Sequence, residues 1–236
     1  MTKLWKVKEG EIHLWHIPFD EKKIELKLLS SREIAKGNAF KFPTHKHQFW
    51  LYRTMLRKVL SLYSNIPPEK ICFSYSEFGK PSFENNASLQ FNLSHSQNLG
   101  VIALTHSSPV GVDIEEMKTL EDFEEIVKQF FSKKEYADFQ QIPVQEQLDP
   151  FYTLWTCKEA FVKALGEGLS YPLDQFSISW KKPPTVLEIQ GSRQEASLWS
   201  IQSYITQSKM RSYKVSCLVK NNVSQLKKIP LFFDSL

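Results

Sequence analysis

Apolar residues recur at helical spacing in two long stretches of the chain, residues 45–63 and 151–169. Positions i, i+3, i+4 and i+7 lie on one face of a helix, so each stretch predicts a long amphipathic helix with one buried side. The apolar positions are Phe49, Tyr52, Met55, Leu56, Val59, Leu60 and Tyr63 in the first stretch, and Phe151, Leu154, Trp155, Phe161, Val162 and Leu165 in the second. Helix-boundary signals flank both stretches, at Pro43, Asn65 to Pro68, Pro150, Gly166 and Gly168.

Shorter stretches of alternating or β-branched residues predict strands. The predicted strands cover residues 11–17, 72–75, 88–93, 100–105, 110–114, 176–180, 185–189, 198–204 and 213–219. Two adjacent helices are predicted at 119–130 and 132–141, and residues 20–27 are predicted to form a loop or a short helix. Ser30 with Glu33, and Ser132 with Glu135, have the spacing of capping boxes at helix starts.

The order of these elements predicts the fold class. Strand, helices and strands are followed by helices and strands again, which is typical of an α/β (α+β) protein built from two similar units. We expect an N-terminal half of residues 1–109 and a C-terminal half of residues 110–236, each a small sheet with helices packed on it. The two halves show no convincing residue-level repeat.

The composition predicts a folded protein, because 42% of the residues are hydrophobic and 13% are aromatic. The three cysteines are far apart and lack CxxC spacing, which favours a reducing compartment over a disulfide framework or a zinc site. The charged first residues precede no apolar run typical of a signal peptide, and no stretch approaches the ~20 apolar residues that span a bilayer. We therefore expect a soluble cytoplasmic protein that binds neither a membrane nor a nucleic acid.

The net charge of +4 is divided unevenly along the chain. Residues 1–110 hold 15 Lys and Arg against 9 Asp and Glu, a net charge of +6, together with all six histidines. Residues 111–236 hold 15 Lys and Arg against 17 Asp and Glu, a net charge of −2. This uneven charge suggests that the first half binds an anion and that the second supplies carboxylates. The alternative is a chance imbalance.

Two polar motifs accompany the predicted strands in the middle of the chain. FNLSHS (residues 91–96) is typical of a strand that ends in a polar turn, whose hydroxyl, backbone N–H and imidazole groups suit phosphate oxygens. In GVDIE (residues 111–115), Asp113 and Glu115 point to one face of a strand, where two carboxylates are unfavourable unless a cation or a lysine lies between them. Oxygen ligands of this kind suit Mg²⁺. The alternatives are a solvated Ser/Asn loop and an exposed acidic strand end.

A third signal is the pair Glu159 and Lys163 in the second long helix. Their side chains lie on neighbouring turns because the two residues are four apart. Alone they predict a solvated ion pair worth a few tenths of a kcal/mol. Together with the two strand motifs, they are candidates for the carboxylate and the cation of one phosphate-binding site.

These motifs, in this order, resemble those of the Sfp-type 4′-phosphopantetheinyl transferases. The resemblance rests on Gly79-Lys80-Pro81, FNLSHS (91–96), GVDIE (111–115), FSKKEY (131–136) and LWTCKEAFVKALGEGL (154–169). It implies two α/β halves related by a pseudo-two-fold axis, with the active site at their interface. It also implies that the phosphopantetheine arm of coenzyme A is transferred to a serine hydroxyl of an apo acyl or peptidyl carrier protein, releasing adenosine 3′,5′-bisphosphate.

The resemblance further implies roles for individual residues. The metal ligands would be Asp113, Glu115 and Glu159, and they would hold Mg²⁺ or alternatively Mn²⁺. The catalytic groups would be Glu159 as general base, Lys163 beside the leaving phosphate, and His95. The groups that hold coenzyme A would be Lys36, His47, Lys80, Ser94, His95, Asp113 and Lys163. The family's arginine near the start of the first long helix is absent, so either Lys46 or His47 replaces it at the 3′-phosphate, or that phosphate is held less tightly.

Docking of the carrier is expected at Phe130, Phe131, Lys133 and Lys134, for which the alternative is core aromatics with solvated lysines. We expect a monomer.

Two other functions stay open from the sequence. One is a Mg²⁺-dependent hydrolase of nucleotide pyrophosphates, although no dedicated water-activating residue is identified. The other is a non-catalytic module that binds a carrier or coenzyme A, against which the intact acidic residues and Lys163 argue.

Overall fold

The two halves of the molecule repeat one order of elements. The computed structural model describes residues 4–119, 123–220 and 227–232, except for the side chains of Leu169 and of residues 227–232. In each half a strand is followed by a long helix and then by a hairpin, whose second strand pairs antiparallel with the first strand. The predicted α/β (α+β) fold of two similar halves is therefore confirmed.

The first half packs a long helix on a small sheet. Its elements are β1 (Glu11–Pro18), α1 (Ser31–Asn38), α2 (Pro43–Ser64), β2 (Phe73–Tyr75), β3 (Pro81–Phe83), β4 (Leu89–Ser96) and β5 (Leu99–His106). Short 3₁₀ helices cover Glu21–Lys23, Leu26–Leu28 and Pro68–Lys70. β4 and β5 form the hairpin, and β5 pairs with β1.

The second half repeats this arrangement with longer connections. Its elements are β6 (Val110–Glu116), α3 (Phe123–Phe130), α4 (Lys133–Phe139), α5 (Leu148–Leu165), β7 (Phe176–Ser179), β8 (Thr185–Ile189), α6 (Arg193–Ala196), β9 (Trp199–Ser208) and β10 (Arg211–Lys220). Short 3₁₀ helices cover Val144–Glu146, Gly168–Ser170 and Leu173–Gln175. β9 and β10 form the hairpin, β10 pairs with β6, and β7 pairs with β8.

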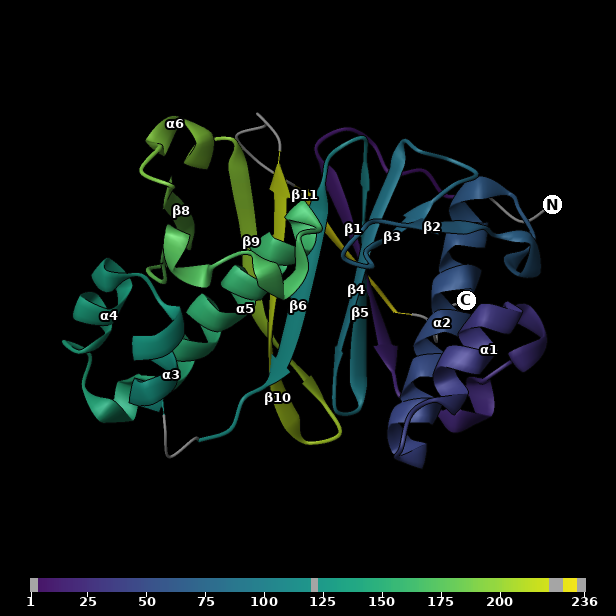
Figure 1. The fold of residues 1–236 in the computed structure, drawn as a ribbon, viewed down its shortest axis with the longest axis horizontal. Coiled ribbons are helices and arrows are strands. Elements are labelled where there is room, and N and C mark those ends of the chain that lie inside the picture. The colour runs from purple at the N-terminus through teal and green to yellow at the C-terminus, as the bar shows by residue number, and fades with distance from the viewer. Residues whose placement is uncertain (1–3, 120–122, 221–226, 233–236) are drawn as a thin grey trace.

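The two main sheets pack against each other between the two long helices (Figure 1). Strands β1 and β5 share an apolar layer with β6 and β10, made of Ile12, Leu14, Leu99, Val101, Ala103, Val110, Val112, Ile114, Tyr213, Val215, Cys217 and Val219. The other face of the first sheet is covered by α2, and the other face of the second sheet by α5. The layers therefore run helix, sheet, sheet, helix, with the seam between the halves at the centre.

The last strand returns to the first half. β11 (Lys227–Phe232) pairs in parallel with β1 at the edge of a sheet ordered β11-β1-β5-β4. The sequence predicts no strand here, because Pro230 interrupts the segment and prolines are confined to sheet edges. The expected second half, residues 110–236, therefore includes one strand whose backbone pairs with the first half.

The backbone of α5 lies so close to β6 that only glycine fits between them. A Cβ on Gly111 would lie 1.9 Å from the carbonyl oxygen of Ala160 and 2.5 Å from the nitrogen of Ala164. Real Cβ atoms do not approach backbone atoms this closely, so a larger residue would push the helix outward. The glycine thus sets the distance at which the helix and the strand present their polar side chains to each other.

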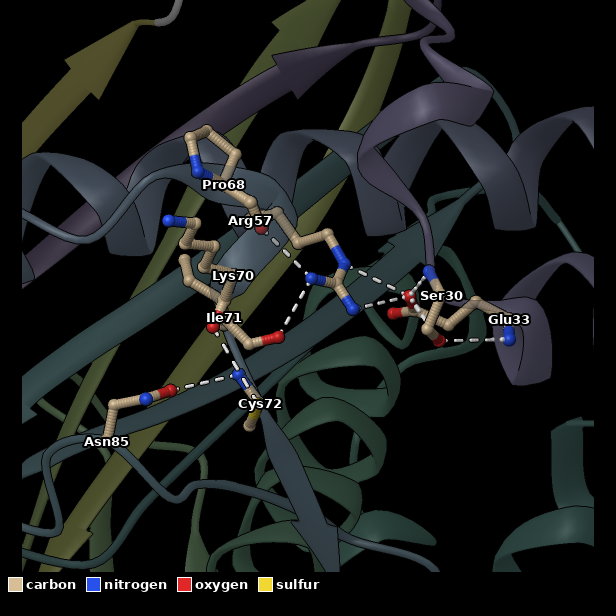
Figure 2. A network of polar contacts seen from close by, with 8 residues as sticks. All are labelled: Ser30, Glu33, Arg57, Pro68, Lys70, Ile71, Cys72 and Asn85. Atoms are coloured by element: carbon tan, nitrogen blue, oxygen red, sulfur yellow. Dashed lines mark hydrogen bonds and ion pairs between the residues drawn. The ribbon is translucent and has the colours of Figure 1, made fainter.

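A buried ion pair joins α1 to α2 (Figure 2). Arg57 donates from Nε and Nη2 to one oxygen of Glu33, at 3.0 and 2.7 Å, and from Nη1 to the carbonyls of Pro68 and Ile71, both at 2.9 Å. The same Glu33 oxygen accepts from the Ser30 backbone N–H at 2.9 Å, and the Ser30 hydroxyl accepts from the Glu33 N–H at 3.3 Å. The predicted capping box at Ser30 is therefore confirmed. Removing either charge would leave the other buried and uncompensated.

The hairpin between β4 and β5 differs from its prediction. Ser94 and His95 lie within β4 rather than in a polar turn after it, and the turn is formed by Gln97, whose φ is 49°, and Asn98. The strand continues because its serine hydroxyls bond to side chains of β6 instead of facing solvent. The other long hairpin, β9 with β10, extends beyond the predicted 198–204 and 213–219.

Most other predicted elements are present near their expected bounds. The first long helix starts at Pro43 rather than at residue 45, and the second starts at Leu148 rather than at Pro150. Ser132 caps α4 in a complete capping box with Glu135. Residues 120–122 of the predicted 119–130 helix lie outside the described residues. Throughout the part of the chain that the structure describes, every helix is too short or too polar to cross a bilayer.

Gly111→Ala is expected to destabilise the protein by more than about 2 kcal/mol, because the added methyl group must displace α5 from β6. Urea unfolding followed by tryptophan fluorescence measures this loss. The control is Gly191→Ala, whose Cβ meets open space at a φ of 78° and which should cost about 1 kcal/mol. Equal stability of the two variants would contradict the close packing of α5 on β6.

Candidate active site

Three carboxylates and one ammonium group converge where α5 lies on β6. Asp113 and Glu115 lie two and four residues after Gly111 on β6, so all three share one face of the strand. This face packs against α5 at Gly111. Glu159 and Lys163 project from α5 one turn apart. Lys163 Nζ lies 2.5 Å from Asp113 Oδ1, so its ion pair joins the helix to the neighbouring strand. The structure thus brings together the three carboxylates and the lysine that the sequence singles out.

The first half contributes two hydroxyl groups from β4 to the same place. The Ser94 hydroxyl donates to Asp113 Oδ1 at 2.9 Å and accepts from Lys163 Nζ at 3.1 Å. Two residues along the strand, the Ser96 hydroxyl donates to Glu115 Oε2 at 3.0 Å. Both halves therefore supply the site, as the two-half architecture predicts.

The Asp113 carboxylate retains an unpaired acceptor that fits a cation. The residue is 2% exposed, and its Oδ2 is buried without a hydrogen-bond partner, whereas Oδ1 accepts from Ser94 and Lys163. A buried carboxylate oxygen without a partner is unfavourable unless a cation reaches it. Within the described ranges, no three His, Cys, Asp or Glu side chains already form a metal-binding cluster. The oxygen donors present nevertheless suit a hard divalent cation such as Mg²⁺.

The electrostatics of the site follow from burial and like charge. Burial, together with the charge of Asp113, raises the pKa of Glu115 to about 7. Burial also raises the pKa of Glu159, and the attraction of Lys163 only partly offsets it. Burial opposes the charge on Lys163, but the neighbouring carboxylates, Asp113 first, outweigh it and its pKa lies above the usual value. The cluster is therefore rich in negative charge that one lysine does not neutralise.

His95 is held in a fixed orientation at the edge of the site. Its ring stacks on Tyr52 with centroids 4.7 Å apart and an interplanar angle of 15°. The same Tyr52 ring lies over Gly100, where a Cβ would be 2.4 Å from it. Burial, assisted by the charge of Lys163, lowers the pKa of His95 to about 4, so the imidazole is neutral at pH 7.

Two cavities meet beside the carboxylates. The larger one, of about 450 Å³, lies in the first half and is lined by Phe40, Thr44, His45, Gln48, Phe49, His95, Ser96 and Gln97. The smaller one, of about 300 Å³, is lined by Ser96, Gln97, Glu115, Glu116, Lys118, Ile126, Phe151, Tyr152 and Trp155. Ser96 and Gln97 line both, so the cavities adjoin at the seam, next to Glu115.

Comparison with known proteins identifies the family. A sequence model described as the 4′-phosphopantetheinyl transferase superfamily matches residues 109–218, and one described as 4′-phosphopantetheinyl transferase, N-terminal, matches residues 13–107. The 4′-phosphopantetheinyl transferase HetI of Nostoc sp. (strain PCC 7120) is 38% identical over 167 residues, which cover 68% of this chain and 70% of that protein. The chain belongs to this superfamily.

Other relatives of the transferase agree. The 4′-phosphopantetheinyl transferase Sfp of Bacillus subtilis (strain 168) is 39% identical over 153 residues, which cover 65% of this chain and 67% of that protein. A solved holo-(acyl-carrier-protein) synthase from Bacillus anthracis, in complex with CoA (3′,5′-ADP), covers 47% of this chain and 93% of its own at 17% identity and a TM-score of 0.36. That structural likeness is too weak to assign a fold or a ligand.

The remaining residues expected to hold coenzyme A lie outside this cluster. Lys36 Nζ lies 5.6 Å above the ring of Phe49, which lines the larger cavity. His47 Nδ1 lies 3.0 Å from a carboxylate oxygen of Glu21. Lys46, the other candidate for the 3′-phosphate, places its Nζ 4.5 Å above the Trp50 ring.

Lys80 of the transferase contacts backbone rather than open space. Its Nζ donates to the carbonyl oxygens of Ala164 at 2.8 Å and Val110 at 3.2 Å. Burial lowers its pKa to about 8, so the group is still largely charged at pH 7. Two of its three donors are therefore occupied by the elements that carry the acidic residues.

The segment expected to dock a carrier divides into core and surface. Phe131 is 3% exposed and belongs to the core of the second half, so it is a core aromatic rather than a docking residue. Phe130 is half-buried with its edge on Trp155, at 5.8 Å between ring centroids. Lys133 is exposed, and the exposed Lys134 pairs with Asp138 at 2.9 Å.

The motif around Glu135 and Lys158 has a structural role. Lys158 is fully buried, and its Nζ lies 2.8 Å from Glu135, which is 1% exposed. Lys158 also donates to the carbonyls of Leu173 and Phe176, while Glu135 accepts from the Ile178 N–H. This buried pair fastens α4 and β7 to α5, and breaking it would leave an uncompensated charge.

Sequence reasoning missed three parts of the site. Ser96, which bonds Glu115, lies in the FNLSHS motif, and its signal was the period of two that Ser94 and Ser96 share with Asp113 and Glu115. Gln97, which lines both cavities, is marked by no motif or periodicity in the sequence. Tyr52 is found by the helical pattern only as a core residue, because stacking on a histidine 43 positions away depends on tertiary packing.

Tyr52→Leu is expected to raise the pKa of His95 above about 4, because the ring that covers one face of the imidazole is removed and that face gains solvent. The charge of Lys163 should keep it below the usual value. NMR titration of the histidine ring protons measures this shift. The Tyr52 hydroxyl has no partner, so Tyr52→Phe is the matched control and should leave the pKa unchanged. An equal shift in both variants would contradict the stacking.

Proposed function

We propose that this transferase moves the phosphopantetheine arm of coenzyme A onto a serine hydroxyl of an apo acyl or peptidyl carrier protein, with Mg²⁺ held by Asp113, Glu115 and Glu159. The observation that carries the proposal is the state of Asp113. One of its oxygens accepts from Ser94 of the first half and Lys163 of the second, while the other is buried without a partner. A site that joins both halves and lacks one positive charge suits a metal-bound pyrophosphate.

The two adjoining cavities support positions for the two substrates. The larger cavity lies in the half with a net charge of +6, is lined by His45 and His95, and suits the nucleotide of coenzyme A. The smaller cavity, with Phe151, Tyr152 and Trp155 in its wall, suits the uncharged pantetheine arm and the approaching carrier. The pyrophosphate would then cross the seam beside Glu115.

The residues of the seam can carry out the transfer. The serine oxygen of the carrier forms a bond to the phosphorus of the phosphopantetheine phosphate, the bond from that phosphorus to the adenosine phosphate breaks, and the serine proton passes to Glu159. Glu159 projects from α5 one turn before Lys163, so its carboxylate is placed at the seam as a positioned base for that proton. Lys163, whose pKa lies above the usual value, keeps its charge and offsets that of the leaving phosphate. When bound, Mg²⁺ neutralises the pyrophosphate and polarises the phosphorus under attack.

The transfer itself is tested by mass spectrometry of apo carrier proteins incubated with coenzyme A, Mg²⁺ and the enzyme. Addition of the phosphopantetheine mass is expected for at least one carrier, and no addition on any of several carriers would refute the proposal. Glu159→Gln should lower the rate by at least about a hundredfold, because a positioned base contributes about 10²–10⁴. Glu167→Gln, at an exposed position beyond α5, is the control and should keep full activity.

Mg²⁺ should raise the melting temperature of the wild-type protein by several degrees relative to a chelator, because it binds the folded carboxylates and not the unfolded chain. Asp113→Asn should abolish this rise, since the amide removes the central negative charge. Differential scanning fluorimetry gives the measurement without any substrate, and Asp138→Asn on the surface of α4 is the control. An undiminished rise in Asp113→Asn would exclude Asp113 as a metal ligand.

A further inference from the structure

We infer that Lys80 is a positioning residue, which clamps the end of α5 and the start of β6 to the first half and thereby fixes Lys163 relative to Asp113. The inference rests on the proposed transfer reaction, and it assigns Lys80 a role other than binding the phosphates or nucleotide of coenzyme A. Lys80 belongs to the turn between β2 and β3, which is part of the first half. Its ammonium group nevertheless ends on backbone of the second half.

The two acceptors of Lys80 belong to the two elements that build the carboxylate cluster. Ala164, whose carbonyl accepts at 2.8 Å, directly follows Lys163 on α5. Val110, whose carbonyl accepts at 3.2 Å, lies three residues before Asp113 on β6. One ammonium group therefore bonds to the backbone one residue after Lys163 and three residues before Asp113.

The carbonyl of Ala164 is a natural acceptor for a lysine from another element. The last four carbonyl groups of a helix lack partners within the helix, and the negative end of the helix dipole lies there. α5 ends at Leu165, and its cap Gly166 has a φ of 79° and donates to the Val162 carbonyl. Lys80 satisfies the carbonyl of Ala164, two residues before that cap, with a positive charge, which is the favourable sign at this end.

The turn that carries Lys80 is itself fixed against α5. The Ser76 N–H donates to the Lys80 carbonyl at 2.9 Å, and the Ser76 hydroxyl accepts from the Lys80 N–H at 3.1 Å. That hydroxyl also lies 3.5 Å from the carbonyl oxygen of Gly166. A Cβ on Gly166 would lie 3.0 Å from the aliphatic stem of Lys80, so the glycine leaves room for this side chain. The lysine is therefore held along its length, and its head group has little freedom to reach a ligand.

A clamp and a phosphate ligand predict different kinetic effects. If Lys80 positions Lys163, its loss weakens an interaction made with the leaving phosphate and lowers kcat. If Lys80 grips coenzyme A in the ground state, its loss raises the KM for coenzyme A and leaves kcat unchanged. A merely structural lysine would lower the melting temperature and change neither constant of the folded enzyme.

The test is steady-state kinetics of Lys80→Met with coenzyme A and an apo carrier that the wild-type enzyme modifies. We expect kcat to fall about tenfold while the KM for coenzyme A stays within twofold. Lys70→Met, at an exposed position in the first half, is the matched control and should behave as wild type. A raised KM with unchanged kcat, or two unchanged constants, would overturn the inference. Inactivity of the wild-type enzyme on every carrier would instead refute the proposed function, so the two failures are distinguishable.

Hydrogen exchange gives a second measurement that needs no turnover. In Lys80→Met, amides of residues 160–168 and 110–113 should exchange faster than in wild type, because the helix end and the strand start lose their common partner. If Lys80→Met does not fold, Lys80→Gln serves instead, because its shorter side chain keeps an uncharged NH₂ group. It should also lower kcat and speed the exchange of the same amides. Unchanged exchange in both segments of a folded variant would overturn the inference.

Discussion

The burial of the Asp113 carboxylate between the two halves is the constraint on which the site depends. A charge at 2% exposure has to be compensated, and here the compensation comes from both sides of the seam, from Ser94 on β4 and Lys163 on α5. Because these partners belong to different halves, the halves must meet in one register for the charge to be satisfied. The docking of the halves and the assembly of the site are thus one event.

The site gathers acidic groups where their ionisation is unfavourable. Glu115 and Glu159 are placed where burial and like charge raise their pKa values, so ionising them costs more free energy in the folded protein than in the unfolded chain. The surrounding structure is stiff enough to impose that cost. Gly111 holds the α5 backbone directly on β6, and the buried pair of Lys158 and Glu135 fastens the same helix to α4 and β7. Raised pKa values at a cluster of acidic groups are typical of functional sites.

Local pattern sufficed for most of the fold and for the placement of the acidic residues on β6. Apolar periodicity predicted both long helices, and the period of two placed Asp113 and Glu115 on one face. Sequence failed where polar residues were satisfied by distant partners. Ser94 and His95 looked like a turn because nothing in the sequence shows that β6 lies opposite. The backbone acceptors of Lys80 gave no signal either, because they are 30 and 84 positions away. Strand β11 was hidden by its proline and by a parallel partner at the other end of the chain.

The pairing of β11 with β1 has a consequence for how the molecule is made. During synthesis β1 emerges before the second half and β11 after β10, so one edge of the first sheet stays uncovered while the strands and helices from β6 to β10 are being translated. An uncovered strand edge is a template for pairing with another chain. The nascent protein is therefore most exposed to intermolecular strand pairing just before β11 is made, and translation that terminates between β10 and β11 would release a chain with an open sheet edge.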